Sequence, residues 1–266
     1  MRLPGKKGAF FSYADPLSTK QVLERADVLI HLAGENIAKG RWTKKKKQGL
    51  KKSRIETTKA LVQAMEACSF PPKVFLCASA VNYAGEKNDQ SFTEDVLPEK
   101  GFLSQLCQEW EDAATTDRSR CAQLRFGMVL GPYGAGSALD PMAFLTKLGL
   151  SAKLSTGKQF ISWIHIEDAL RAIDWVIQQS LEGPIHISSP YPERQDDFAR
   201  LLAKMLQRPY FLKMPRWLMR AFLGEIADEL FCKSVKAIPK KLLDSGFCFS
   251  YPDLRSALQK ILQSKR

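Results

Sequence analysis

The sequence of 266 residues contains few histidines, no paired cysteines and no long hydrophobic run. No stretch approaches the roughly 20 apolar residues of a transmembrane helix, and Met1–Phe11 lacks the apolar core of a secretory signal. The six cysteines form no C-x-x-C pair, and the three histidines, His31, His165 and His186, stand far apart. We therefore expect no disulfide framework and no metal site, and we expect reduced thiols in a cytoplasmic protein.

The net charge of +12 is unusual in a composition that is otherwise ordinary, with 45% hydrophobic and 26% charged residues. Much of this charge lies in Lys44–Lys47 and in Lys51, Lys52 and Arg54. We favour a solvated helix face as its explanation, and attraction for anionic substrates such as dinucleotides is a second one. Nucleic-acid binding is a third hypothesis, which no zinc finger or RNA-recognition signature supports. We expect neither a nucleic-acid partner nor a membrane partner.

Short apolar runs alternate with amphipathic stretches along the chain. The runs predict strands at Asp27–Leu32, Val74–Ala78, Gln123–Leu130 and Pro184–Ser188. The amphipathic stretches predict helices at Ser18–Arg25, Lys45–Cys68, Ser104–Ala114, Pro141–Leu150, Glu167–Gln179, Asp196–Leu206, Pro215–Leu223 and Asp253–Leu262. This order indicates an α/β fold with a parallel sheet that is covered on both faces. We place a boundary after residue 188, with a mainly helical region at 189–266.

Small residues follow three of the predicted strands. They are Ala33-Gly34, Ser79-Ala80 and Gly131. Ligands of open parallel sheets bind beyond the carboxyl ends of the strands, so these positions predict a binding edge. A tight turn after each strand is the alternative explanation.

Longer strings of residues resemble a known family. They are HLAGENI (31–37), SRIETTKALV (53–62), ASAVNYAG (78–85), LCQEWE (106–111), LRFGMVLG (124–131), STGKQFISWIHIEDAL (155–170) and GFCFSYPDL (246–254). In order and spacing they resemble the epimerase-like family of the extended short-chain dehydrogenase/reductases. The resemblance implies an NADP-binding, Rossmann-like doubly wound sheet in residues 1–188 and a family-specific C-terminal domain in 189–266.

The resemblance also implies which residues contact the cofactor. The implied cofactor residues are Arg2, Leu32, Ala33, Gly34, Arg54 and Val129. Arg2 matches an arginine that pairs with the 2′-phosphate of NADP, and Leu32–Gly34 match a strand end that packs on the adenosine part. Each position also has a simpler explanation. Arg2 is then an ordinary terminal arginine, and Leu32–Gly34 form a turn. Arg54 is a surface charge and Val129 a core residue.

The sequence departs from this family at its start. Family members begin with a strand, a glycine-rich turn that binds the pyrophosphate, a helix and a second strand. Gly5 and Gly8 do not replace that turn, because no strand precedes them and no helix follows. We therefore expect a sheet that lacks its first βαβ segment, with an unpaired apolar gap. Either the start codon lies upstream or the chain is a shortened descendant, and we expect weakened or lost NADPH binding.

A second departure concerns catalysis. The family pairs a serine with a Tyr-x-x-x-Lys, whose lysine lowers the pKa of the tyrosine. Ser79 keeps the serine position, but residues 101–105 read Gly-Phe-Leu-Ser-Gln. Tyr83 is a substitute phenol or, more simply, a packing residue. Trp163, His165 and Asp168 match a segment near the substrate cleft, where we expect structural roles, with Asp168 as a helix cap or a favourable partner of the helix dipole.

Two functions from different classes follow. The first is an NADP-dependent oxidoreductase or nucleotide-sugar-epimerase-like enzyme that acts on a small or nucleotide-linked substrate. The second is a non-catalytic nucleotide-binding or scaffold relic of such an enzyme. The sequence does not name the substrate, and it leaves a monomer and a homo-oligomer open.

Overall fold

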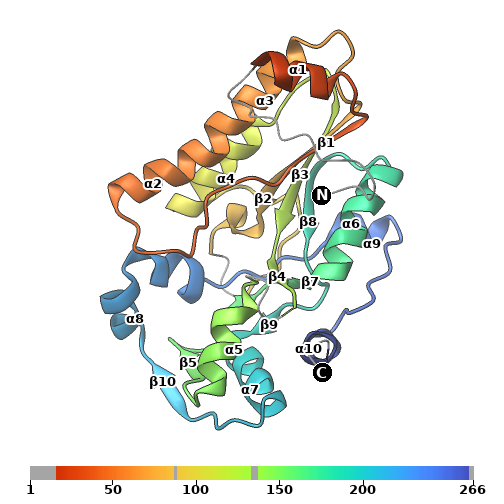
Figure 1. Ribbon diagram of the computed structural model, residues 1–266. Helices are drawn as coiled ribbons and strands as arrows, with labels where there is room; N and C mark the ends of the chain where they lie inside the picture. Colours follow the sequence, from red (N-terminus) through yellow and green to blue (C-terminus); the bar gives the residue numbers. More distant parts are fainter. Residues whose placement is uncertain (1–15, 87–88, 133–136, 264–266) are drawn as a thin grey trace.

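A four-stranded parallel sheet forms the centre of the molecule. The computed structural model describes residues 16–86, 89–132 and 137–263. The strands follow the order β1-β2-β3-β8 (Figure 1). Their bounds are β1 Val28–His31, β2 Val74–Ala80, β3 Arg120–Phe126 and β8 Gly183–Ile187. All neighbouring pairs are parallel, which confirms the predicted α/β fold.

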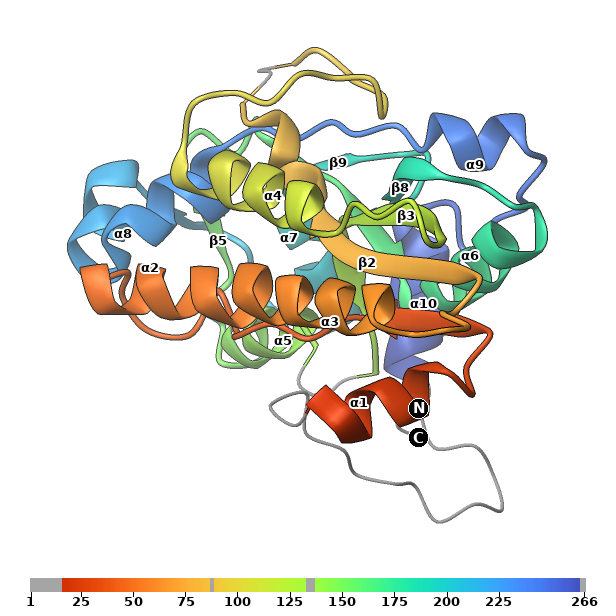
Figure 2. The ribbon, with the colours of Figure 1, turned by 90° about the horizontal axis from the view of Figure 1, so that it is seen from above.

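Helices cover both faces of this sheet. One face carries α1 (Pro16–Leu23), α3 (Thr57–Glu66) and α4 (Phe102–Ala113), and the other carries α6 (Ile166–Gln178). Figure 2 shows the two groups on opposite sides of β2 and β3. A short helix, α9 (Lys240–Asp244), packs beside β8.

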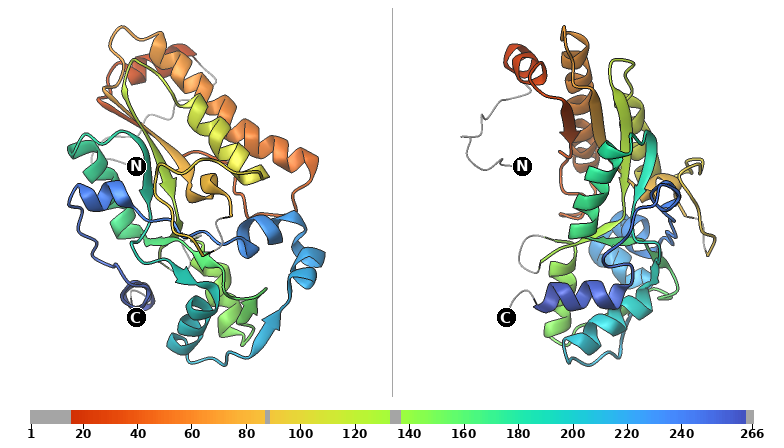
Figure 3. Two further views of the ribbon diagram at one scale, coloured as in Figure 1. Left: turned by 180° about the vertical axis from the view of Figure 1, so that it is seen from behind. Right: turned by 90° about the vertical axis from the view of Figure 1, so that its right-hand side faces the viewer.

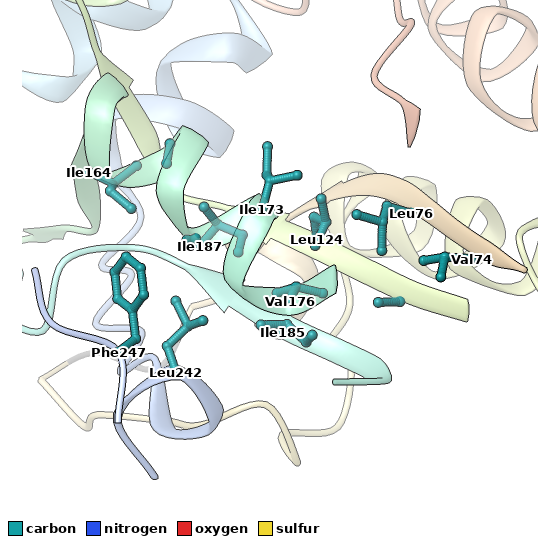
Figure 4. Packing of buried hydrophobic residues seen from close by; sticks show 13 residues of the cluster. Val74, Leu76, Leu124, Ile164, Ile173, Val176, Ile185, Ile187, Leu242 and Phe247 are labelled. Carbon is teal, nitrogen blue, oxygen red and sulfur yellow. The ribbon is translucent and has the colours of Figure 1, made fainter. Parts of the chain in front are cut away.

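The side chains of β2 alternate between the two layers of the core. Val74 and Leu76 join Ile173 and Val176 of α6 in one cluster (Figure 4). Phe75 and Cys77 face the other way, toward α3 and α4. Because both faces of the strand are buried, its sequence is continuously apolar, which is why the sequence pattern located it.

The long helix predicted over residues 45–68 is interrupted. Its parts are α2 (Lys44–Lys51), the π-helical turn η1 (Lys52–Glu56) and α3. Thr43 caps the start, since its hydroxyl accepts a hydrogen bond from the Lys46 amide at 3.2 Å. The predicted helix is confirmed as one helical run from Lys44 to Glu66, and the π turn within it was not predicted.

The predicted strand 123–130 is also two strands. Gly127 separates β3 from β4 (Met128–Leu130), and β4 pairs with β7 (Trp163–His165) and not with the central sheet. A Cβ atom on Gly127 would lie 2.8 Å from the carbonyl oxygen of Ser162. Glycine therefore lets the chain pass close to a neighbouring backbone as it leaves the central sheet.

A second lobe lies beyond the carboxyl ends of the strands (Figures 1 and 3). Its elements are α5 (Leu139–Lys147), β5 (Ala152–Leu154), β6 (Phe160–Ile161), β9 (Glu193–Arg194), α7 (Gln195–Met205), β10 (Leu212–Met214), α8 (Arg216–Leu223), the π-helical turn η3 (Ala227–Cys232) and α10 (Leu254–Gln263). Leu139 of α5 shares a core with Phe198 of α7 and Leu258 of α10. The lobe thus combines segments from both sides of residue 188, and the domain boundary there stays a prediction.

β1 lies at one edge of the sheet within the described residues. Ile30 and Leu32 are exposed at this edge, which agrees with the apolar gap expected of a sheet without its first segment. Among the described residues, no helix is long and apolar enough to cross a membrane.

Candidate functional site

The carboxyl end of β1 forms an exposed strip of small and apolar residues. Leu32 is 54% exposed, and Ala33 and Gly34 are exposed beside it. The Arg54 side chain lies on this strip and donates a hydrogen bond from Nη2 to the carbonyl oxygen of Glu35 at 3.0 Å. A Cβ atom at position 34 would lie 3.1 Å from Cζ of Arg54. The absence of a side chain at Gly34 therefore lets the guanidinium rest on the backbone.

The indole ring of Trp110 in α4 packs against the Arg54 guanidinium. The guanidinium carbon lies 5.1 Å from the centre of the indole ring. The indole Nε1 donates to the hydroxyl of Thr58 at 3.0 Å, and the His31 ring meets the indole edge-on at 6.4 Å. Burial lowers the pKa of Arg54 from its usual value, but the group remains a cation.

Arg54 also belongs to the π-helical turn η1. Its carbonyl oxygen accepts a hydrogen bond from the hydroxyl of Thr58 at 2.6 Å. Such turns occur frequently at functional sites, where they change the direction in which a side chain leaves a helix.

Ser79 lies at the carboxyl end of the neighbouring strand in a row of polar residues. It stands opposite Arg125 of β3, which in turn stands opposite His186 of β8. The Ser79 hydroxyl donates to Oε1 of Glu111 at 2.5 Å. Arg125 holds the same carboxylate with two hydrogen bonds of 2.8 Å. All three side chains are largely buried, so Ser79 is fixed in one orientation by an ion pair.

Tyr83 covers this ion pair. The Arg125 guanidinium lies 3.6 Å from the centre of the Tyr83 ring, and its Nη1 donates to the carbonyl oxygen of Glu94 at 2.9 Å. Burial raises the pKa of Tyr83 above its usual value. The phenol therefore stays protonated at neutral pH and can act as a hydrogen-bond donor.

The segment where the family resemblance predicts Tyr-x-x-x-Lys lies against the C-terminal lobe. Gly101 has a φ of 145°, and a Cβ atom there would lie 2.8 Å from Nζ of Lys233. Lys233 forms an ion pair of 2.8 Å with Glu229, whose other oxygen accepts a hydrogen bond from the Leu103 amide at 3.3 Å. A buried carboxylate thus caps α4 where the sequence lacks Tyr-x-x-x-Lys.

Of the remaining predicted cofactor residues, only Val129 lies within the described structure. Val129 is in β4 opposite Ile164 and packs partly buried against the core of the sheet. Arg2 lies outside the described residues. The contribution of either side chain to cofactor binding stays a prediction.

Trp163, His165 and Asp168 make structural contacts. The Trp163 indole is buried and donates to the carbonyl oxygen of Tyr191 at 3.1 Å. His165 caps α6, since its Nδ1 accepts from the Glu167 amide at 3.1 Å, and burial lowers its pKa.

Asp168 links α6 to the C-terminal segment. Its carboxylate accepts hydrogen bonds from the Ser250 and Tyr251 amides at 2.9 and 2.8 Å, and Arg171 pairs with it at 2.8 Å. It was expected to cap its own helix or to interact favourably with the helix dipole, and it lies in the first turn of α6. Its hydrogen bonds also fix the segment that leads to α10.

Several lysines of the basic run are engaged in ion pairs. Lys46 pairs with Glu35, Lys47 with Glu225 and Lys51 with Glu109, each at 2.6 Å. These contacts tie α2 to neighbouring elements and reduce the free charge of the run. Its suggested role toward nucleic acid stays untested.

Sequence reasoning missed Trp110, Glu111 and Arg125 as site residues. All three lie within strings that carried the family resemblance, and Arg125 was visible as a lone cation inside an apolar strand. A charge in such a run requires a buried partner, but the sequence does not say which carboxylate supplies it.

Other features of the described structure lie away from this site. Two open hollows are present, one between α7 and α10 and one at the amino ends of β3 and β8, and no site residue lines either of them. No cluster of potential metal ligands occurs among the described residues.

Two family models match the sequence. The NAD-dependent epimerase/dehydratase family matches residues 5–188, and a domain of unknown function, DUF1731, matches residues 214–261. The first match contains the exposed strip, Arg54 and Ser79. The second contains α8, Glu229 and Lys233.

Curated proteins of bacteria are similar in sequence to this chain over most of its length. The epimerase family protein YfhF of Bacillus subtilis is 34% identical over 252 residues, which cover 93% of this chain and 82% of the relative. The epimerase family protein Mb2239 of Mycobacterium bovis is 37% identical over 240 residues, covering 89% and 78%.

Solved structures agree with these relatives. The human epimerase family protein SDR39U1, crystallised with NADPH, superposes with a TM-score of 0.84 at 30% identity and covers 90% of this chain and 82% of the human one. A nucleoside-diphosphate sugar epimerase of Corynebacterium glutamicum superposes with a TM-score of 0.73 at 28% identity, covering 93% and 49%.

Proposed function

The chain belongs to the NAD-dependent epimerase/dehydratase family, and we propose that it is an NADP-dependent oxidoreductase or nucleotide-sugar-epimerase-like enzyme. Its substrate would be a small or nucleotide-linked molecule. The main observation behind this proposal is the contact of the Arg54 guanidinium with the exposed backbone of Gly34, at the carboxyl end of β1. A fixed cation at that edge of a parallel sheet suits an anionic dinucleotide.

The residues present fit such a cofactor. The exposed strip Leu32–Gly34 offers a flat apolar surface for the adenosine part, and a side chain at position 34 would fill the space that Arg54 uses. Arg54 offers forked N–H donors that suit phosphate oxygens. Arg2 and Val129 are further proposed contacts.

The bound cofactor would supply hydride transfer, and the chain's own residues would supply binding and proton handling. These 266 residues contain no G-x-x-G-x-x-G sequence. We therefore propose an affinity for NADPH below that of a protein with this glycine-rich turn, since backbone N–H groups for the pyrophosphate come from it.

Ser79 is the proposed residue for holding a substrate oxygen. Its proton is directed to Glu111, so the hydroxyl oxygen keeps a lone pair for a donor on the substrate. Tyr83 is the nearest phenol to the Glu111–Arg125 pair, and we propose that it donates a proton toward the substrate. Arg125 beneath the ring favours the phenolate that would form.

Thermal unfolding with and without NADPH tests the proposal. A ligand that binds only the folded chain raises the midpoint of unfolding as its concentration increases. We expect NADPH to raise it, and we expect adenosine alone to raise it less because adenosine lacks the phosphates. The proposal fails if neither NADPH nor NADH shifts the midpoint at saturating concentration.

A further inference from the structure

α8 and the turn before β10 expose several large apolar side chains. Trp217 is 70% exposed, and Phe211 and Phe222 are each 68% exposed. Leu223, at the end of the helix, is also exposed, whereas Met219 is the buried residue of α8. Exposed apolar groups gathered in one short stretch of chain mark an interaction site more often than chance.

Polar contacts hold the end of α8 on the molecule. The Arg41 side chain donates to the carbonyl oxygen of Ala221 at 3.4 Å. Just after the helix, Glu225 pairs with Lys47 of α2 at 2.6 Å. The helix is thus fixed in place while most of its apolar side chains remain in contact with water.

The polar part of this stretch is entirely basic. Residues 211–224 include Lys213, Arg216 and Arg220 and contain no aspartate or glutamate. Asp228 forms ion pairs with the Nε atoms of both arginines, at 2.6 and 3.1 Å. Lys213 is exposed. A partner for this stretch must therefore accept apolar groups and tolerate or supply negative charge.

The position of α8 makes it accessible. It lies at one end of the molecule, beside the start of α2, in views from two directions (Figures 1 and 2). Lys44 and Lys45 are exposed at that start. Exposed cations therefore occur at the start of α2 as well as within residues 211–224.

An anionic lipid surface fits these features better than the other partners. A second copy would bring two basic faces together across a two-fold axis, because the same patch meets itself there. A nucleic acid would use the aromatic rings for stacking, but it would leave Leu223 without a role. Tryptophan, phenylalanine and leucine on a short helix flanked by cations are typical of a helix that lies in the membrane interface.

We propose that α8, with Phe211 and the flanking cations, is a peripheral docking surface for membranes that contain anionic lipids. This surface departs from the sequence-based expectation of no membrane partner, and it requires no membrane-spanning helix. The apolar side chains enter the headgroup region, and the cations contact lipid phosphates. The proposal is independent of the cofactor site at β1.

Flotation with lipid vesicles tests this surface in the full chain. Vesicles of phosphatidylcholine alone and vesicles that also contain phosphatidylglycerol are compared at low and high salt. We expect binding to the anionic vesicles, weakened by salt, and little binding to the neutral ones. The variant Trp217→Ser with Phe222→Ser should lose at least tenfold in binding, because both side chains are exposed and their loss leaves the fold intact.

Phe70→Ser is the matched control. Phe70 is 79% exposed, in the turn after α3, and lies outside the proposed surface. Its substitution should leave vesicle binding unchanged. Absence of binding to anionic vesicles would overturn the proposal, and so would equal losses in the two variants. Trp217-dependent dimerisation, measured by light scattering, or Trp217-dependent binding of a single-stranded oligonucleotide in place of vesicles would also overturn it.

Discussion

The guanidinium of Arg54 lies so close to Gly34 that a Cβ atom at position 34 would be 3.1 Å from its central carbon. The two residues belong to different elements, since Gly34 follows β1 and Arg54 lies in η1. Their contact places a cation at the carboxyl edge of the sheet. A change at either residue should therefore alter cofactor binding more than folding.

Gly34→Ala should weaken NADPH binding several-fold with little change in stability. The added methyl group displaces the guanidinium by a few tenths of an ångström, because the arginine can move outward into solvent. Lys59→Ala is the control, since Lys59 is exposed on α3 and lies outside the exposed strip. Equal effects of the two substitutions on the dissociation constant would contradict the proposed site.

Glu111→Gln should destabilise the fold by about 3 kcal/mol, because it leaves the Arg125 charge buried without its partner. Ser79→Ala should cost only about 1 kcal/mol, the usual value of one hydrogen bond. Urea unfolding of both variants measures these changes. The double variant Glu111→Leu with Arg125→Met should recover much of the loss, and a Glu111→Gln protein as stable as the parent would refute the buried pair.

Two buried histidines should make stability depend on pH. Burial lowers the pKa of His31 and of His186 to about 4, against an ordinary value of 6.5. The unfolded chain therefore binds protons at a higher pH than the folded one, and the free energy of unfolding falls as the pH decreases from about 6.5 to about 4.

His31→Phe isolates one of these contributions. The variant keeps a ring against Trp110 but cannot titrate. Across that pH range it should lose less stability than the parent, by up to about 3 kcal/mol. The free energy of unfolding of both proteins is measured by chemical unfolding at several pH values. If it falls equally with decreasing pH in the parent and in His31→Phe, the folded state does not protect His31 from protonation.

Asp168→Ala should release the segment before α10. The substitution removes the acceptor of the Ser250 and Tyr251 amides and should cost about 2 kcal/mol. Hydrogen exchange should accelerate at these two amides while the amides of β2 stay protected. Unchanged exchange at Ser250 and Tyr251 would mean that Asp168 does not hold this segment.

The layers of the fold were predictable because strands that are buried on both faces are continuously apolar. Val74–Ala78 was located for this reason and lies in the central sheet as part of β2. Pro184–Ser188, which contains His186, was also located and overlaps β8. The break at Gly127 was not predictable, since it arises from the approach of Ser162, which is distant in sequence. The short strands β5 and β10 were missed because each has three residues and no alternating pattern.

The candidate site was predictable only where it follows strand ends. The small residues after β1 indicated the exposed strip, and the family resemblance added Arg54. The pairing of Ser79 with Glu111 depends on the packing of α4 against the sheet, which no local pattern specifies. For the same reason the sequence did not indicate that Lys233 lies beside Gly101.

The most direct test of the account is the NADPH dissociation constant, measured by titration calorimetry for this chain and for Arg54→Met. Lys59→Met, on the exposed side of α3, serves as the control. The account predicts that the parent and Lys59→Met bind alike, and that Arg54→Met binds roughly tenfold more weakly through loss of a charge-assisted contact. No measurable binding by the parent chain, or equal binding by the parent and Arg54→Met, would contradict it.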